Sequence, residues 1–303
     1  MILHGTVTAA LAGRRLDDVV HALFPQLSKG RIRKVIDWGG CRVNGDVVRV
    51  ASRGLHPDDG LVVGITDEER FVEYAIDPGA LLLDDPEYLA LSKPAGIYCQ
   101  RTPYQLKGTV EFAVAQYFKS TGSPEPARIV HRLDRGTSGV MLFPKTRESA
   151  AHLSRQLEVG RVEKVYWALV AGVPQEKDWT VEAPIAPLGK SEFAVREDGR
   201  TAETRFRLLG CGRDALGAEV SLVEARPQTG RTHQIRLHLV HAGHPVLGDD
   251  RYGGAPPAPR MMLHCRSMAF AAADGRPVAA VAPLEARFEA ACAASGITPP
   301  VAS

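Results

Sequence analysis

Apolar positions near the start of the chain repeat at helical spacing and then alternate as they do in strands. Ile32, Val35 and Ile36 share one face of a predicted helix that Ser28 can cap, which leaves the basic residues of this segment on the other face. Asn44-Gly45 follows between two short β-prone runs, a pattern typical of a hairpin. The pattern predicts a small unit in which a hairpin follows a helix.

The rest of the chain mixes strand-like and helix-like patterns. Apolar β-prone runs predict strands at 88–91, 140–143, 164–170 and 221–225. Another strand is predicted to end at Ile129-Val130. Helical spacing predicts helices at 109–118, 147–158 and 284–294. Prolines and glycines interrupt 180–207, which indicates short hairpins.

A charged segment, Thr66-Asp67-Glu68-Glu69-Arg70, divides the chain. The 303 residues are enough for one large domain and one small domain. We therefore predict a small N-terminal domain at 1–66, a linker at 67–79, a larger domain at 80–295 and a short tail at 296–303.

Positive charge is concentrated in the N-terminal part. The whole chain has a formal net charge of only +2, which by itself indicates neither the presence nor the absence of a nucleic-acid partner. Between 28 and 53, however, seven lysines and arginines stand against two aspartates, a local net charge of +5. This excess predicts either a solvated charged helix face or a surface that binds a polyanion.

The five cysteines are scattered without a close pair, which fits neither a disulfide framework nor a thiolate zinc site. We expect free thiols in a reducing compartment. The first residues lack the basic and apolar regions of a signal peptide, and no apolar run approaches membrane-spanning length. The expected location is therefore the cytoplasm.

The clearest chemical signal is the stretch HRLDRGTSG at 131–139, in which one carboxylate, Asp134, lies between Arg132 and Arg135. Neighbouring arginines favour the charged form of a carboxylate and oppose the effect of burial. A charged carboxylate can stabilise positive charge on an anomeric carbon or bond covalently to it. The alternative from these residues alone is an Asp-Arg pair that steadies a surface loop.

The same nine residues resemble the active-site motif H-R-L-D-x-x-T-S-G of the RluA-type family of RNA pseudouridine synthases, and every fixed position is met. The resemblance implies a cofactor-free isomerisation in which uracil is cut from its ribose, rotated and rejoined through C5. It implies that Asp134 acts on the sugar, either by direct attack or through a glycal after proton abstraction. It also implies that Arg132 helps to displace the target base from the RNA.

A second segment, 226–238, resembles the family motif P-x-T-G-R-T-H-Q-I-R. Thr229 can cap a helix that carries Arg231 and Arg236, and a helix start with arginines is suited to phosphate. The resemblance implies that Arg236 pairs with Asp134 and that Arg231 contacts the RNA backbone.

Two strand segments complete the resemblance. Lys164 and Tyr166 match a K-x-Y pattern, which implies that Tyr166 stacks on the target uracil and can move a proton. Leu263 lies in a segment that resembles the family's L-H-A strand and would form an apolar wall of the pocket. At the K-P-A-G turn, Ser92 replaces the usual Asn, a departure expected to affect the turn more than the chemistry.

The basic N-terminal part resembles the S4 RNA-binding module, which implies that its cationic side chains bind RNA: Lys29, Arg31, Arg33, Lys34 and Arg42. The two resemblances imply an α+β fold. A mixed, mainly antiparallel central sheet with flanking helices and a catalytic cleft is expected, joined to a small N-terminal S4-like αβ domain.

The implied partner is structured RNA, and the S4-like part favours large-subunit ribosomal RNA over transfer RNA. Transfer RNA stays an alternative, as does a non-catalytic RNA-binding relative. We expect a monomer with no cofactor, no metal and no membrane partner.

Four neighbouring histidines raise a third alternative, a metal-dependent hydrolase. His238, His241 and His244 have i, i+3 spacing and could face one side of a helix. The sequence opposes this interpretation because Gly243 is expected to end the helix and no H-E-x-x-H pattern is present.

Overall fold

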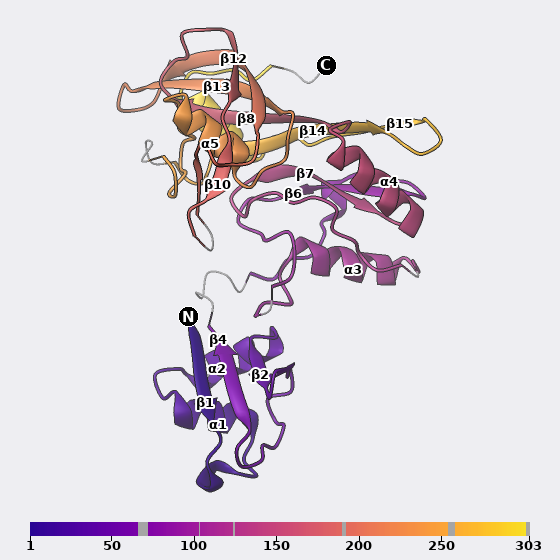
Figure 1. Ribbon diagram of the computed structural model, residues 1–303, viewed down its shortest axis with the longest axis vertical. Coiled ribbons are helices and arrows are strands. Elements are labelled where there is room, and N and C mark those ends of the chain that lie inside the picture. Colours follow the sequence, from indigo (N-terminus) through magenta and orange to yellow (C-terminus); the bar gives the residue numbers. More distant parts are fainter. Residues whose placement is uncertain (66–71, 103, 124, 190–191, 254–257, 301–303) are drawn as a thin grey trace. The chain divides into compact units, whose positions relative to one another are not determined.

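The computed structural model describes residues 1–65, 72–102, 104–123, 125–189, 192–253 and 258–300 (Figure 1). The chain forms two compact units. The first contains Met1–Ile76 and Ile97–Pro124, and the second Asp77–Gly96 and Glu125–Ser303. The charged boundary predicted at 66–70 lies outside the described residues. Residues 97–124 group with the first unit. The predicted domains at 1–66 and 80–295 stay a prediction.

The first unit is built on a four-stranded antiparallel sheet in the order β1 (Ile2–Thr6), β4 (Gly60–Gly64), β2 (Cys41–Val43) and β3 (Asp46–Val47). Asn44 and Gly45 connect β2 to β3 with φ of 52° and 91°. Positive φ at both central residues is what a tight type I′ hairpin turn requires, so the predicted hairpin is confirmed.

Helices α1 (Leu16–Leu23) and α2 (Lys29–Asp37) complete this part of the unit. The Ser28 hydroxyl accepts a hydrogen bond from the Arg31 amide at 3.2 Å, which confirms the predicted cap of α2. Ile32, Val35 and Ile36 are buried in the core of the unit, as their helical spacing predicts.

The segment before helix α3 (Val110–Ser120) is joined to the end of α2. The Leu106 amide donates to the Trp38 carbonyl at 2.7 Å, and the Lys107 ammonium pairs with Asp37 at 2.7 Å. Thr109 caps α3 by accepting from the Phe112 amide. These contacts explain why 97–124 belongs to the first unit.

The second unit is built on a nine-stranded sheet. Eight strands follow one another in the order β5 (Leu81–Asp84), β6 (Tyr88–Lys93), β7 (Ser138–Pro144), β14 (Leu263–Ala271), β8 (Glu163–Ala171), β13 (Glu219–Pro227), β12 (Glu203–Arg213) and β9 (Asp178–Glu182), while β15 (Pro277–Val281) pairs with β14. Among the strand pairs of this sheet in the described residues, β7 and β14 are parallel to each other, and the other pairs are antiparallel. The predicted mixed, mainly antiparallel sheet is confirmed.

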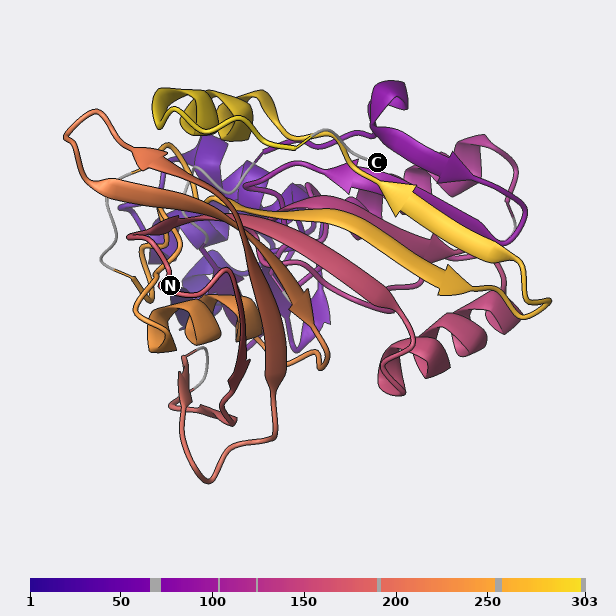
Figure 2. The same ribbon diagram turned by 90° about the horizontal axis from the view of Figure 1, so that it is seen from above.

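Among the described residues, this sheet is accompanied by a hairpin, β10 (Ile185–Pro187) with β11 (Phe193–Val195), and by the α-helices α4 (Arg147–Glu158), α5 (Gln234–His241) and α6 (Ala286–Ala294). Helices α5 and α6 lie on opposite faces of the sheet (Figure 2). Both contribute to the core, α5 through Ile235 and Leu239 and α6 through Phe288 and Cys292.

No helix among the described residues is long and apolar enough to span a lipid bilayer.

The prediction of a strand that ends at Ile129-Val130 is wrong. Residues 128–137 are irregular, and the sheet order has no strand there. β7 pairs with β14 only at Ser138 and Gly139, so its later residues lack a strand partner on that side. The His131 ring takes the place of one such partner, since its Nε2 accepts a hydrogen bond from the Leu142 amide at 2.9 Å.

Gly139 is required where β7 meets β14. Its φ is 110°, and a Cβ at this position would overlap the Cys265 carbonyl. Cys265 is in register with Gly139 on one side and with Tyr166 on the other. The sheet therefore places the end of the HRLDRGTSG stretch two strands away from Tyr166.

Candidate active site

The loop before β7 and helix α5 meet at Asp134. The Arg236 guanidinium donates from Nη1 to Asp134 Oδ2 at 2.8 Å. The Asp134 side chain stays 27% exposed, whereas that of Arg236 is 8% exposed. Two residues 102 positions apart are thus brought together, with the carboxylate open to a ligand and the arginine behind it.

Asp249 holds Arg236 in this orientation. Its two oxygens accept from Arg236 Nε and Nη2 at 2.7 Å each, and its side chain is 2% exposed. Burial by itself would raise the pKa of Asp249, but the hydrogen bonds from Arg236 outweigh it, so the pKa lies below its usual value. Burial would lower the pKa of Arg236, and its two carboxylate partners raise it above the ordinary value instead. This bidentate pair keeps Arg236 charged and directs its remaining nitrogen at Asp134.

His233 lies on the other side of Asp134. Its Nε2 is 3.6 Å from Asp134 Oδ1, too far for a hydrogen bond but close enough for an electrostatic contact. His233 has a φ of 58°, a left-handed conformation that is uncommon for a residue with a side chain. The backbone thus directs the imidazole toward the carboxylate from the start of α5.

Tyr252 contacts the second nitrogen of the His233 ring. The Tyr252 oxygen accepts from the Phe193 amide at 3.3 Å and lies 2.6 Å from His233 Nδ1. When the Tyr252 hydroxyl donates to Nδ1, the proton of a neutral ring is on Nε2, facing Asp134. Burial lowers the pKa of His233 below its ordinary value. Asp134 opposes this effect, and Arg236 reinforces it.

Tyr166 lies on the half-buried face of β8, two residues from Lys164. It hydrogen-bonds to the Cys265 thiol, whose pKa is raised by burial to about 12. Burial, with a smaller contribution from the nearby Lys164 ammonium, lowers the pKa of His131 to about 4. Because His131 and Asp134 share one loop, this proximity places the loop on the side of β8 that displays Lys164 and Tyr166.

The K-P-A-G turn supports the loop from behind. Lys93 is fully buried and donates to the carbonyls of Pro94 at 2.9 Å and of Arg135 at 3.3 Å. Gly96 and Arg135 are joined by two more hydrogen bonds, from the Gly96 amide and from Arg135 Nε. The residue after Asp134 is therefore fixed through both its backbone and its side chain.

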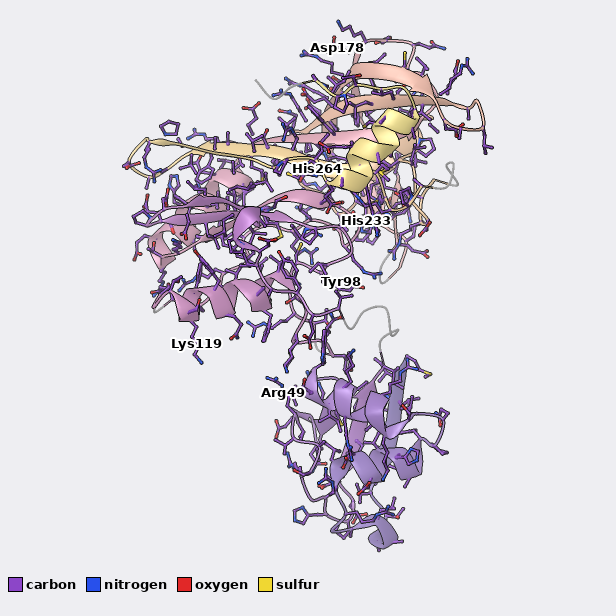
Figure 3. All side chains as sticks on the ribbon, turned by 180° about the vertical axis from the view of Figure 1, so that it is seen from behind. Arg49, Tyr98, Lys119, Asp178, His233 and His264 are labelled. Carbon is purple, nitrogen blue, oxygen red and sulfur yellow. The ribbon has the colours of Figure 1, made fainter. Side chains whose placement is uncertain are left out.

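A partly buried ion pair supports the other end of the loop. Arg260 donates from Nη2 to Ser138 Oγ at 3.0 Å and pairs with Glu285 at 2.8 Å, and Glu285 also accepts from the Ala95 amide. Ser138 Oγ lies 2.8 Å from His264 Nδ1. Burial lowers the pKa of His264 to about 4, so this ring is neutral at pH 7. His233 and His264 are both labelled in Figure 3.

The remaining predicted residues of the second unit have varied surroundings. Arg132 is exposed, and Leu263 is 3% exposed within the core. The prediction that Thr229 caps the helix is wrong, because α5 begins at Gln234 and Thr229 accepts from the Glu203 amide instead. Arg231 therefore lies before the helix, where its Nε donates to the Thr201 carbonyl at 2.9 Å.

The basic residues of the first unit are partly paired within it. Lys29 contacts Asp18 at 2.6 Å, and Arg33 contacts Asp17 at 2.7 Å. The Arg42 guanidinium donates to the Gly45 carbonyl at 2.7 Å. Lys34 lies 6.0 Å from the centre of the Trp38 ring, and Arg31 is half-buried. The side chains of Lys29 and Arg33 are still 49% and 57% exposed, so both remain accessible to a ligand.

The histidines that raised the metal alternative have other partners. His238 contacts Thr204 and the Ala183 carbonyl, and His244 contacts the Ala171 carbonyl. Within the part of the chain that the structure describes, no three His, Cys, Asp or Glu side chains are grouped so that they could hold a metal ion.

Sequence reasoning gave no role in the isomerisation to five residues that complete this site: His233, Asp249, Tyr252, Arg260 and Glu285. His233 was considered only as one of the four histidines of the metal alternative. The segment 248–254, GDDRYGG, resembles the family's G-D-x-x-Y-G segment, and this resemblance is a usable signal for Asp249 and Tyr252. Arg260 and Glu285 lie outside the matched motifs, and their pairing across 25 residues has no local signature.

Comparisons with known proteins agree with the geometry. The family model described as "RNA pseudouridylate synthase" matches residues 87–241, and the model of the S4 domain matches 14–61. An uncharacterized RNA pseudouridine synthase of Aquifex aeolicus is 34% identical over 245 residues, covering 79% of this chain and 77% of that protein. The ribosomal large subunit pseudouridine synthase D of Pasteurella multocida is 32% identical over 262 residues, covering 85% of this chain and 79% of that protein.

A solved structure is also similar. Human RNA pseudouridylate synthase domain containing 1 has a TM-score of 0.61 and 26% identity, covering 75% of this chain and 94% of that chain. The present chain therefore belongs to the RNA pseudouridine synthases of the RluA type, with an S4 domain ahead of the synthase part.

Proposed function

We propose that this enzyme isomerises uridine to pseudouridine in large-subunit ribosomal RNA, with Asp134 as the group that acts on the ribose. The observation that carries the proposal is the Asp134 carboxylate, exposed at 27% and held by Arg236 at 2.8 Å. The name of the relative from Pasteurella multocida supports the choice of ribosomal RNA.

The reaction exchanges one bond to the sugar for another. The bond between uracil N1 and ribose C1′ breaks, a bond between C5 and C1′ forms, C5 loses a proton and N1 gains one. Positive character on C1′ during cleavage is stabilised by a nearby carboxylate, which can also bond to the sugar. Direct attack by Asp134 and proton abstraction to a glycal are both compatible with this arrangement.

Other residues handle the base. A stacked uridine must leave the RNA helix to reach Asp134, at a cost of a few kcal/mol. Arg132 is exposed and beside the loop, and its flat guanidinium can stack where the base has left. Tyr166 then stacks on the extruded uracil, and Leu263 contributes an apolar wall.

The S4 domain supplies affinity for the RNA backbone. Its cationic face includes Lys29, Arg31, Arg33, Lys34 and Arg42, and phosphate contacts of this kind make affinity depend on salt. We propose that the enzyme acts in the cytoplasm as a monomer, without a cofactor or metal.

Release of tritium from C5-labelled uracil tests the activity. Ribosomal RNA from the large subunit and bulk transfer RNA, each labelled at C5, are incubated separately with the protein in the absence of added metal. Release from ribosomal RNA supports the proposal, and release only from transfer RNA moves the substrate to that class. Binding without release indicates a non-catalytic relative, and chelator-sensitive strand cleavage indicates a metal-dependent hydrolase.

A further inference from the structure

The second unit contains a surface pocket of about 480 Å³ that the reaction described above does not use. It lies between the β10–β11 hairpin and helix α5. Phe193 and Ala194 line it from the hairpin, Leu237 and Val240 line it from α5, and Tyr252 also lines it.

The pocket combines an apolar interior with a polar rim. Phe193 and Tyr252 present half-buried aromatic rings, and Leu237 is buried beneath them. Glu192, His241 and Arg251 are exposed lining residues and surround the opening. A flat aromatic molecule with a polar edge fits this distribution, since its faces can pack on the rings while its edge meets the rim.

Tyr252 also connects the pocket to the catalytic carboxylate. Its oxygen lies 2.6 Å from His233 Nδ1, and His233 Nε2 lies 3.6 Å from Asp134. The Arg236 guanidinium lies 4.7 Å from the centre of the Tyr252 ring. One residue, His233, thus separates the pocket wall from Asp134, and an RNA strand with its target ribose at Asp134 brings neighbouring nucleotides to the pocket.

We propose that this pocket holds the base of a nucleotide adjacent to the target uridine, unstacked from the RNA and lying against Phe193 and Tyr252. The proposal rests on the proposed function, because it needs an RNA strand at Asp134. Single-stranded bases are commonly bound by stacking on aromatic side chains and by hydrogen bonds to their edges. The positive charge of Arg251 suits the phosphates that accompany such a base. The enzyme therefore prefers uridines whose flanking base leaves the stack readily.

Filling the pocket tests this proposal. Val240→Trp fills it from α5 and Ala194→Phe from the hairpin, while Val281→Trp, at a 47% exposed strand position that does not line the pocket, is the matched control. The substrate is a synthetic RNA stem-loop containing the modified uridine, made also with a single abasic nucleotide at each flanking position. Melting curves confirm that each variant is folded.

For the wild-type protein, one abasic position lowers kcat/KM by about 10-fold, the factor expected for the loss of one stacked base. Both filling variants lower kcat/KM on the intact RNA by a similar factor and respond no further to that abasic position. The control behaves as wild type. If the filling variants have the kcat/KM of the wild type, the pocket does not hold a flanking base. The same conclusion follows if their loss of kcat/KM multiplies the loss caused by an abasic nucleotide at every flanking position.

A photochemical crosslink gives a readout that needs no turnover. The same RNA carrying 5-iodouridine at the sensitive position, or at each flanking position in turn if no turnover occurs, is bound and irradiated. Attachment at Phe193 or Tyr252, abolished in Val240→Trp, supports the pocket, whereas attachment only elsewhere overturns it. If the crosslink forms but no pseudouridine does, the proposed function is refuted and the base site is kept. If pseudouridine forms without the crosslink, the base site is refuted and the proposed function is kept.

Discussion

Asp249 binds Arg236 through two hydrogen bonds of 2.7 Å, and this pairing leaves the Nη1 nitrogen of Arg236 directed at Asp134. The pair is almost fully buried, so water cannot replace either partner. The exposed Asp134 carboxylate is thus oriented by a buried contact 13 residues beyond Arg236 in the chain.

Removing Asp249 tests this support. Asp249→Ala leaves the Arg236 charge buried with one partner, and the loss of one member of a buried pair costs about 3–5 kcal/mol of unfolding free energy. Pseudouridine formation should fall by at least about 10²-fold, since misplacement of a catalytic group by about 1 Å has that effect. Urea unfolding and single-turnover assays measure the two losses. The neighbouring exposed Asp250→Ala is the control, and equal behaviour of the two variants contradicts the role of Asp249.

The His131 ring makes stability depend on pH. Its pKa is about 4 in the folded chain and about 6.5 when unfolded. Between these values only the unfolded chain binds the proton, so stability is fully present above pH 6.5 and is lost as the pH falls toward 4. The slope approaches about 1.4 kcal/mol per pH unit for one such group.

His131→Gln should flatten this dependence, because a glutamine oxygen can accept from the Leu142 amide without titrating. Melting temperatures of the wild type and the variant are compared from pH 7 to 4. His264 contributes in the same window and remains in both proteins, so only part of the slope disappears. Parallel curves for the two proteins would show that His131 does not titrate there.

Asp17 stabilises the first unit through its pairs with Arg15 and Arg33. Hydrogen bonding from Arg15, opposed by burial and reinforced by Arg33, lowers the pKa of Asp17 to about 2. This contribution is present above pH 3.8 and is lost as the pH falls through about 2. Because both arginines are about half exposed, Asp17→Asn should cost only about 1–2 kcal/mol at pH 7. Urea unfolding measures this, with Asp18→Asn as the control.

Two basic residues of α2 separate RNA binding from stability. Lys34→Ala should weaken binding to ribosomal RNA, reduce the dependence of log affinity on log salt by about one ion, and lower the melting temperature less than Arg33→Ala does. Arg33→Ala should weaken binding and also lower the melting temperature, because Asp17 loses a partner. Filter binding across a salt series measures both. Unchanged affinity and salt slope in both variants would remove the S4 domain from RNA recognition.

The parts of the fold that the sequence predicted correctly depend on neighbouring residues. The Ser28 cap and the Asn44-Gly45 turn involve atoms a few positions apart, so their signals are local. The prediction of a strand ending at Ile129-Val130 was wrong because β-prone residues form a strand only beside a partner strand. At this place the Leu142 amide of β7 donates to the His131 ring instead. The prediction of Thr229 as a helix cap was wrong because its hydroxyl accepts a hydrogen bond from the Glu203 amide, 26 residues earlier in the chain.

The candidate site also contains residues that the sequence predicted and residues that it did not. Asp134 and Arg236 belong to contiguous motifs, which made their proximity predictable. The support from Glu285 joins it to Arg260 and to the Ala95 amide, contacts that only the folded chain creates. Periodicity and residue type carry no information about such pairs.

The substitution Asp134→Asn is the decisive test of the role given to this carboxylate. The asparagine oxygen can still accept from Arg236, so the fold, the melting temperature and the affinity for ribosomal RNA should stay close to those of the wild type. If Asp134 acts on the ribose, no pseudouridine forms in ribosomal RNA after long incubation, as read by chemical mapping. Pseudouridine formed by this variant at a rate near that of the wild type would show that another group does the chemistry.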